Sequence, residues 1–442
     1  MKTVDIDPVE TRERARIFGP AIFAVIVGFI IAFQFVEPAP PNQIVIATGT
    51  PEGAYFAYGN EYSKILAKQH GVTLKVRETA GSAENIRLLE APSDGVQIAF
   101  VQGGLKDEAK TDQLVTLGSL YYEPLWIFHR TDLTPRRIPD LKGLRVAVGP
   151  EGSGTKVLAM TLLERNGITS ENSQLFFNGS QKAADMLLRG EADVAMFVTT
   201  YRTRYIRQLA SSRSITLMGL ERAQAYALLY QYLSVLTLPE GTIDLANNIP
   251  ARDLKLVAPT TQLVARSDLH PALIGLILEA AKSIHFAGGG FEEEGEFPAP
   301  KFLDFKLSAE AERFYRSGPT FLRRYLPFWV ANYIARMTVM LLPLALLLLP
   351  LFKLMPPIYR WRMRSKIYRW YAKLTALDPE YHKGEPPARL EEHLAKLDRL
   401  EEKISSLTVP LAYSDELYQF RLHIDMLRKK LQKAREVETD HR

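Results

Sequence analysis

The chain has 442 residues, of which 47% are hydrophobic and 24% are charged, and its formal net charge is +5. These values predict a globular protein of two or three folded units, and the charge is too small for this length to indicate nucleic-acid binding. The chain contains no cysteine, which excludes disulfides, thiolate metal sites and cysteine nucleophiles.

The first apolar segment, 17–36, reads IFGPAIFAVIVGFIIAFQFV and carries no charge. About 20 residues in a helix cross a hydrocarbon core of ~30 Å. Arg12, Arg14 and Arg16 precede the segment, and basic flanks stay in the cytoplasm. The run is longer than a signal-peptide core, and no A-x-A-like cleavage site follows. We therefore predict a cytoplasmic basic tail over 1–16 and an uncleaved transmembrane helix over 17–36.

The segment 42–325 alternates strand and helix patterns. QIVIATG, VTLKVRET and VQIAFVQGG are typical of strands, and YFAYGNEYSKILAKQ and SAENIRLLEAP separate them as helices. RVAVGP, TKVLAMTLLERNG, AADMLLRGEA and DVAMFVTT repeat the alternation further along. This order predicts a doubly wound α/β fold, in which ligands bind at the carboxyl ends of strands near helix starts.

Two strand–turn–helix units share similar chemistry. Thr48, Gly49 and Thr50 form the first turn, and the second turn at 152–155 lies about 100 residues later. Free N–H groups, hydroxyls and the helix dipole together make an anion site. Helix capping by the Ser and Thr residues is the alternative. Two such turns suit a cleft with one turn in each lobe.

Known nucleotide and metal motifs do not fit the chain. Gly149 and Gly154 have the spacing of a P-loop, but Thr155 precedes Lys156 where the motif requires the reverse order. Neither turn carries a Rossmann fingerprint, and no pair of histidines has the H-E-x-x-H spacing. We therefore expect no cofactor, no metal and no catalytic set.

Five motifs occur in family order: ATGTPEGAYFAYG, ETAGSAENIRLLE, IAFVQGG, LRVAVGPEGSGTKVLAMTLLERNGI and ADMLLRGEADVAMFV. Over roughly 42–300 the chain resembles the TAXI solute receptors, which are TRAP-associated extracytoplasmic proteins. The resemblance implies an α/β type II periplasmic-binding-protein fold with two hinge strands. Lobe 1 would span about 42–125 and 255–325, and lobe 2 about 126–254. Members bind small anionic or amphipathic molecules, including amino acids and carboxylates, and deliver them to a separate TRAP-type permease.

The resemblance also places the ligand-binding residues, which lie at strand ends and helix starts: Thr48, Gly49, Thr50, Tyr55, Gly81, Ser82, Gln102, Gly103, Ser153, Gly154, Thr155, Thr199 and Thr200. Packing is the alternative role for Tyr55. Gln102 ends an apolar strand, where an unsatisfied amide is costly, so we favour a ligand contact. Tyr121 and Tyr122 precede the predicted hinge strand PLWIFHR and suit the cleft wall and the core equally.

The second apolar segment, 328–352, predicts another transmembrane helix, in which Arg336 lies close enough to the outer end to snorkel. A basic cluster follows directly, formed by Lys353, Arg360, Arg362, Arg364, Lys366 and Arg369. Both basic clusters then lie on one side of the membrane and 42–325 on the other. This arrangement departs from the usual family member, which is secreted as a soluble or lipid-anchored receptor.

The tail, 353–442, carries two leucine-rich helical patterns, which predict a helical hairpin, with an intermolecular coiled coil and self-association as the alternative. We expect a receptor in the bacterial inner membrane with a periplasmic binding domain. It would bind a small anionic or zwitterionic ligand and serve a TRAP-type permease. A sensor that signals through the second transmembrane helix and an enzyme on a solute-binding fold are the alternatives. No nucleophile–base pair supports the enzyme.

The two basic clusters predict that both termini are cytoplasmic. Reporters active on only one side of the membrane, fused to the C-terminus, should therefore be active on the cytoplasmic side alone. Activity on the outer side would contradict the placement of the second helix.

Overall fold

The computed structural model describes residues 8–34, 36, 38–378, 387–405 and 414–439. The chain divides into two compact units. One unit is Ala39–Asn332, and the other combines Met1–Pro38 with Tyr333–Arg442. The first unit contains all the strands found in the described residues, arranged in two lobes.

The sheet of lobe 1 has the order β2-β1-β3-β12-β4. Its strands are β1 (Gln43–Ala47), β2 (Thr73–Arg77), β3 (Ile98–Gln102), β4 (Leu114–Tyr122) and β12 (Thr260–Arg266). Strand β1 runs parallel to β2 and β3, whereas β12 runs antiparallel to β3 and β4. The last strand of the region therefore returns from lobe 2 into the middle of the first sheet.

The sheet of lobe 2 repeats this arrangement with the order β7-β6-β8-β5-β9. Its strands are β5 (Leu125–Arg130), β6 (Arg145–Ala147), β7 (Gln174–Phe176), β8 (Val194–Val198) and β9 (Ile215–Met218). Strands β10 (Ser234–Leu238) and β11 (Leu254–Ala258) form a separate antiparallel pair. The predicted α/β class is confirmed, with mixed sheets because one strand in each lobe arrives from the other lobe.

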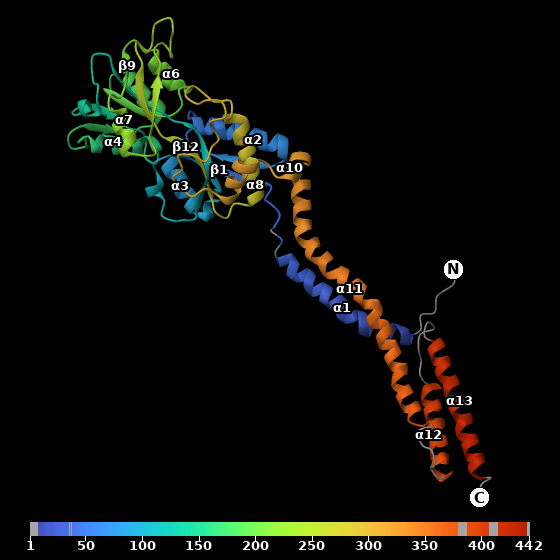
Figure 1. The fold of residues 1–442 in the computed structure, drawn as a ribbon. Helices are drawn as coiled ribbons and strands as arrows, with labels where there is room; N and C mark the ends of the chain where they lie inside the picture. Colours follow the sequence, from blue (N-terminus) through green and yellow to red (C-terminus); the bar gives the residue numbers. More distant parts are fainter. Residues whose placement is uncertain (1–7, 35, 37, 379–386, 406–413, 440–442) are drawn as a thin grey trace. The chain divides into compact units, whose positions relative to one another are not determined.

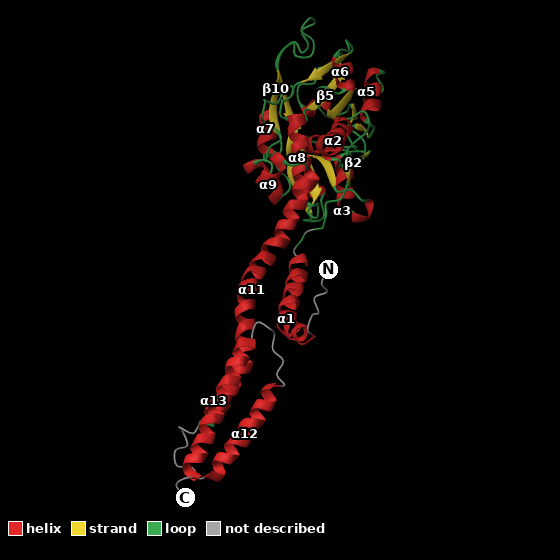
Figure 2. Ribbon diagram, turned by 90° about the vertical axis from the view of Figure 1, so that its right-hand side faces the viewer, coloured by secondary structure: helices red, strands yellow, loops and turns green. Residues whose placement is uncertain are grey.

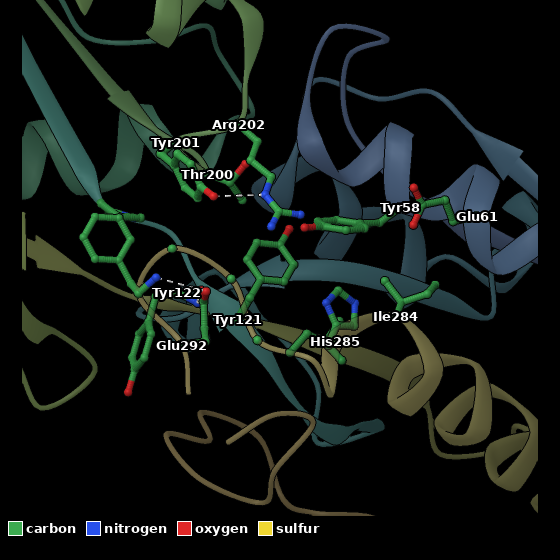
Figure 3. A pocket seen from close by; sticks show the side chains of 16 residues that line it. Tyr58, Glu61, Tyr121, Tyr122, Thr200, Tyr201, Arg202, Ile284, His285 and Glu292 are labelled. Carbon is green, nitrogen blue, oxygen red and sulfur yellow. Dashed lines mark hydrogen bonds between the residues drawn. The ribbon is translucent and has the colours of Figure 1, made fainter. Parts of the chain in front are cut away.

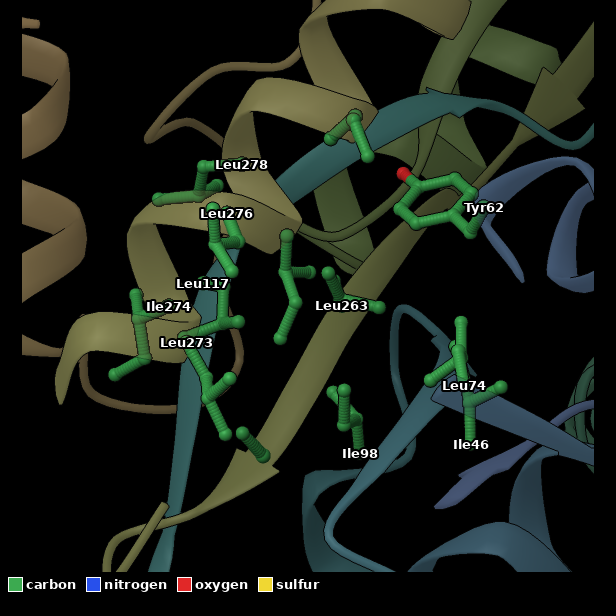
Figure 4. Close-up of a cluster of buried hydrophobic side chains, with 14 of the residues drawn as sticks. Ile46, Tyr62, Leu74, Ile98, Leu117, Leu263, Leu273, Ile274, Leu276 and Leu278 are labelled. Atoms are coloured by element: carbon green, nitrogen blue, oxygen red, sulfur yellow. The ribbon is translucent and has the colours of Figure 1, made fainter. Parts of the chain in front are cut away.

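Helices cover both faces of each sheet. In lobe 1, α2 (Ala54–His70) and α8 (Pro271–His285) lie side by side on one face with α9 (Ala309–Ser317), and α3 (Ser82–Glu90) covers the other face (Figure 2). Strand β3 shows the alternation this requires. Ile98 and Phe100 pack in the core formed with α2 and α8, in which Figure 4 shows Ile98, and Ala99 and Val101 pack in the core formed with α3.

Lobe 2 is built in the same way, as Figure 1 shows. Helices α4 (Gly154–Arg165) and α7 (Ala223–Leu229) share one core, and α5 (Ser180–Leu188) and α6 (Arg204–Ala210) share the other. Short helical turns at Pro92–Asp94, Lys106–Glu108 and Ile138–Leu141 and helix α10 (Phe321–Tyr325) complete the unit. Sheets covered on both faces explain why the strand patterns read as nearly continuous apolar runs.

The chain crosses between the lobes twice. Glu123 and Pro124 join β4 to β5, and Pro259 joins β11 to β12. The two crossings lie against each other, because the backbone N–H of Glu123 donates to the carbonyl oxygen of Pro259 at 2.9 Å. These paired segments are the hinge that brings the carboxyl ends of the β1, β3, β6 and β8 strands to one region.

The other unit consists of α1 (Pro8–Gln34), α12 (Pro387–Ser405), α13 (Ser414–Thr439) and most of α11 (Phe328–Thr375). In the part of the chain that the structure describes, one helix is long and apolar enough to cross a membrane. It spans Phe328–Arg362. The apolar stretch of α1, Gly19–Gln34, is shorter than 18 residues. Residue 35 of the expected first span lies outside the described residues, so that span stays a prediction.

The tail helices pack within one chain. Helices α12 and α13 share an apolar core with the end of α11, formed by Leu374, Leu377, Leu397, Leu400, Ile404, Phe420, Ile424, Leu427 and Leu431. The two leucine-rich stripes therefore face each other, as a hairpin requires. The connection at 406–413 lies outside the described residues, and self-association through the tail stays a prediction.

Candidate functional site

A pocket lies between the two lobes of the first unit, where the starts of several helices meet. Its volume is about 530 Å³, part of which is open to solvent. Lobe 1 contributes the first turns of α2 and α3 and the end of β3, and lobe 2 contributes the first turns of α4 and α5 and the end of β8. This is the position at which open α/β sheets bind ligands.

The helix starts supply hydrogen-bond donors to this pocket. The first N–H groups of a helix have no partner within the helix, and its dipole makes that end positive. The side chain of Ser153 caps α4 by accepting from the N–H of Lys156 at 3.1 Å. Gly53 before α2 and Gly179 before α5 provide no side-chain cap. These two helices therefore keep donors available to a bound anion.

The start of α3 has a different role, because it holds the lobes together. The N–H groups of Ala83 and Glu84 both donate to the carbonyl oxygen of Gly152 in lobe 2, each at 3.1 Å. Beside them, Nε2 of Gln102 donates to the carbonyl oxygen of Gly154 at 3.2 Å. The lobes are thus in contact across the rim of the pocket, and the amide of Gln102 is satisfied by the opposite lobe.

One buried carboxyl group, that of Glu123, lines the pocket from the first crossing. Glu123 is 3% exposed, and its Oε2 accepts a hydrogen bond from the hydroxyl of Tyr55 at 2.7 Å. Burial raises the pKa of Glu123 to about 7, although the hydrogen bond from Tyr55 opposes the rise. No Arg or Lys is among the described residues that line this pocket, so Glu123 is its main ionisable group at neutral pH.

Sequence reasoning missed Glu123, although a signal was present. This residue is the only charged one between the buried strands LVTLGSLYY and LWIFHR. A lone carboxylate between two apolar strands cannot remain buried without a cost. The position of Glu123 in the sequence therefore indicated a candidate functional residue, because the free-energy cost of burying its carboxylate is not explained by packing.

Ten of the thirteen expected site residues line this pocket: Gly49, Thr50, Tyr55, Gly81, Ser82, Gln102, Ser153, Gly154, Thr155 and Thr199. Thr48 does not, because its hydroxyl donates to the carbonyl oxygen of Arg77 and joins β1 to β2. Gly103 donates its N–H to the carbonyl oxygen of Thr260 beside the hinge. Thr200 lies with Tyr121 and Tyr122 at a second cavity (Figure 3).

Residues 46–285, more than half of the chain, match the family described as the NMT1-like family. The chain belongs to this family. The matched segment includes every lining residue of the pocket.

Solved structures also resemble this NMT1-like protein. An ancestral arginine-binding protein bound to arginine is 13% identical, with a TM-score of 0.38, 56% of this chain covered and 93% of the other. PhnD1 from Prochlorococcus marinus in complex with methylphosphonate is 14% identical, with a TM-score of 0.39, and the match covers 62% of this chain and 97% of PhnD1. The alkanesulfonate-binding protein SsuA from Xanthomonas axonopodis pv. citri bound to MOPS is 12% identical, with a TM-score of 0.34, and the match covers 56% of this chain and 75% of SsuA.

We predict that Gly154→Val weakens ligand binding in this NMT1-like protein without unfolding it. A Cβ atom at Gly154 would lie 2.5 Å from Oε1 of Gln102 in the opposite lobe. The protein can relieve that clash by separating the lobes, which removes the closed pocket while each lobe keeps its core. Calorimetric titration of the full chain should show at least a tenfold loss of affinity, equal to about 1.4 kcal/mol.

Gly275→Val is the control, because Gly275 lies on α8 outside the pocket lining and a Cβ atom there meets no atom within 4 Å. It should bind as the wild type does. Equal affinity in the Gly154→Val and wild-type proteins would show that contact between the lobes at this turn is not needed for binding.

Glu123 should make the protein less stable as the pH rises. Its folded-state pKa of about 7 lies above its ordinary value of 4.5, so the folded protein holds the proton more tightly than the unfolded chain. The stability due to this proton is fully present below about pH 4.5 and is lost as the pH rises through about 7. The difference corresponds to roughly 3 kcal/mol.

Glu123→Gln removes this dependence and keeps an acceptor for Tyr55. Thermal melting should show the variant above the wild type at about pH 8, with the gap closing toward about pH 5. Glu164→Gln, at an exposed position on α4, serves as control and should show no such gap. A gap for Glu123→Gln that stays constant with pH would mean that the Glu123 pKa is not raised.

Proposed function

We propose that the chain is a membrane-anchored extracytoplasmic receptor of the TAXI type, and that it binds a small organic acid or zwitterionic amino acid between its lobes. The observation that carries the proposal is the makeup of the pocket. Helix starts from both lobes supply donors, a single buried carboxyl group faces them, and cationic side chains are lacking among the described lining residues. Membership of the NMT1-like family is consistent with this proposal.

The donor side of the pocket suits one carboxylate. The first turns of α2, α4 and α5 bring N–H groups and positive dipole ends to the same space, together with the hydroxyl groups of Thr50, Thr155 and Ser180. Charge-assisted hydrogen bonds to such donors contribute about 1.5–3 kcal/mol each. A group with two full negative charges would lack a compensating cation here, so a monoanionic acid group is favoured.

Glu123 adds a second requirement that favours an α-amino acid over a simple acid. When ionised, its carboxylate is a partner for an ammonium group and is disfavoured next to a second carboxylate. A zwitterion places its carboxylate among the helix starts and its ammonium group toward Glu123. Because the ammonium group lowers the pKa of Glu123, binding releases a proton, and affinity should rise with pH through about 7.

The remaining parts of the proposal concern the membrane and the partner. Helix α11 contains the apolar span Phe328–Arg362, which anchors the receptor, and we propose 17–36 as a second transmembrane helix. The binding domain would face the periplasm and both termini the cytoplasm. A TRAP-type permease would receive the ligand from the anchored receptor.

Sensing is the second candidate, and one observation favours it. Phe328, the first residue of α11, is 3% exposed and belongs to the core of lobe 1, and the helix continues without a break to Thr375. A ligand-dependent change in proteolysis of the 387–439 tail would favour sensing over transport.

A thermal-shift screen of the full chain in lipid nanodiscs tests the proposal. Amino acids such as glutamate and monocarboxylic acids such as propionate should raise the melting temperature, since a ligand at about 100 times its Kd stabilises by ~2.7 kcal/mol. Putrescine and glucose should have no effect. A shift with putrescine or glucose alone would contradict the proposal.

The Glu123→Gln variant then separates amino acids from simple acids. Affinity for the amino acid should fall by about 10- to 100-fold and lose its rise between about pH 6 and about pH 8. Affinity for propionate should stay the same or increase. An amino acid bound equally well by both proteins would place its ammonium group away from Glu123.

A further inference from the structure

A second cavity lies beside the first pocket, on the other side of the β4–β5 crossing. Glu123 lines the first pocket, and Pro124 lines the second. The second cavity has a volume of about 650 Å³, part of it open to solvent. Figure 3 shows its walls, which come from α2, the end of β4, the end of α8, the loop after β8, and a glycine-rich loop at 288–292.

Aromatic rings form one wall of this cavity. The ring of His285 stacks on Tyr121 with centroids 5.4 Å apart and an interplanar angle of 22°, and it meets Tyr58 edge-on at 4.8 Å. His285 is 6% exposed, and burial lowers its pKa to about 3, so the ring is neutral. This wall offers a large apolar surface with no cation inside it.

Three hydrogen-bonding groups converge at the same wall from both lobes. In Figure 3 the guanidinium group of Arg202 points toward the hydroxyl groups of Tyr58 and Tyr121. Nε of Arg202 donates to the hydroxyl of Tyr201 at 3.2 Å, and Arg202 forms no ion pair with any residue that the structure describes. The hydroxyl of Tyr121 is buried and has no hydrogen-bond partner among them either.

Neither carboxylate at the cavity forms an ion pair with Arg202, whose pKa is raised mainly by the hydroxyl of Tyr201 and least by Glu292. Glu292 is held by the backbone, because its Oε1 accepts from the N–H of Tyr122 at 3.0 Å. Glu61 is exposed on α2 and lies beyond Tyr58 from Arg202 in Figure 3. An arginine fork without a carboxylate partner, next to two tyrosine hydroxyls, is suited to a planar acid group.

The glycine-rich loop completes the cavity only when the lobes are together. A Cβ atom at Gly290 would lie 2.4 Å from the ring of Tyr201 in lobe 2, so the loop backbone packs directly on that ring. Phe291 meets the same ring edge-on at 6.3 Å. Lobe 1 and lobe 2 therefore share this cavity, as they share the first pocket.

We propose that this cavity is a second binding site, which takes an organic monocarboxylate with an apolar body. Arg202, Tyr58 and Tyr121 bind the carboxylate, and the body lies against the rings of Tyr121 and His285. The exposed side chain of Arg202 can move to admit the ligand. Because the ligand contacts both lobes, its binding stabilises the state in which they are joined.

The test uses 4-fluorobenzoate as the probe and ¹⁹F NMR of the full chain in nanodiscs as the measurement. The probe should bind the wild type, and 4-fluorobenzamide, which has the same shape without the charge, should bind at least about tenfold more weakly. Equal binding of the two probes, or no binding of 4-fluorobenzoate at millimolar concentration, would overturn the proposal.

Two variants and a matched control identify the residues. Arg202→Gln should weaken 4-fluorobenzoate binding by about tenfold or more, whereas Arg204→Gln, an exposed arginine two residues later, should bind as the wild type does. Tyr121→Phe removes a hydroxyl that has no partner, so the empty protein should melt at the same or a higher temperature while binding falls. Unchanged binding in both Arg202→Gln and Tyr121→Phe would contradict the site.

Competition separates this proposal from the function proposed for the first pocket. Glutamate at saturating concentration should leave the 4-fluorobenzoate signal of the bound state in place, because the two cavities have different linings. Displacement of the probe by glutamate would put it in the first pocket and overturn the second site. The response of the probe to Arg202→Gln tests the second site even if glutamate does not bind.

Discussion

The positions of both cavities in the first unit depend on the pairing of the two segments that connect its lobes. The N–H of Glu123 donates to the carbonyl oxygen of Pro259, so the outgoing and returning chains lie against each other. After each crossing the chain forms an inner strand of the sheet it has reached. Strand β5 joins the sheet of lobe 2, and β12 joins the sheet of lobe 1. The two lobes, each with its own core, therefore face each other at the ends of their strands. One cavity forms on each side of the crossing.

The chemistry of the first pocket follows from what this geometry brings together. Helix starts can bind an anion without any cationic side chain, because their N–H groups and dipoles point to the strand ends. The same geometry buries Glu123 among those donors, where its hydrogen bond from Tyr55 does not cancel the loss of water and its pKa rises to about 7. A donor side and one titratable acceptor in the same pocket are the basis on which we propose a ligand that carries both kinds of charge.

The contact between the lobes uses groups that would otherwise be available to ligand. The N–H groups at the start of α3 bind the carbonyl oxygen of Gly152, and Gln102 binds that of Gly154. The joined state is therefore stabilised by the protein itself, and a ligand adds to an interaction that already exists. At the other end of lobe 1, Trp329 donates to the carbonyl oxygen of His70, next to the buried Phe328, so the beginning of α11 is a part of the lobe 1 fold.

Much of this arrangement follows from local pattern. Apolar runs such as IAFVQ and LWIFHR and the helix between residues 54 and 70 are set by periodicity, which depends only on residues near in sequence, and the turns around Gly49 and Ser153 lie where their strands end. Ten pocket residues could be named on that basis together with the family resemblance. Thr48 could not be separated from them, because its hydroxyl turns toward Arg77 through the pairing of β1 with β2. Three features of the site bring together residues that are far apart along the chain. They are the position of Glu123 in the pocket, the contact of Gln102 with Gly154, and the convergence of Arg202 with Tyr58 and Tyr121. The tertiary structure alone decides such contacts. Sequence periodicity describes the local structure of each segment, but it does not determine the distance between side chains on segments that are remote in the sequence.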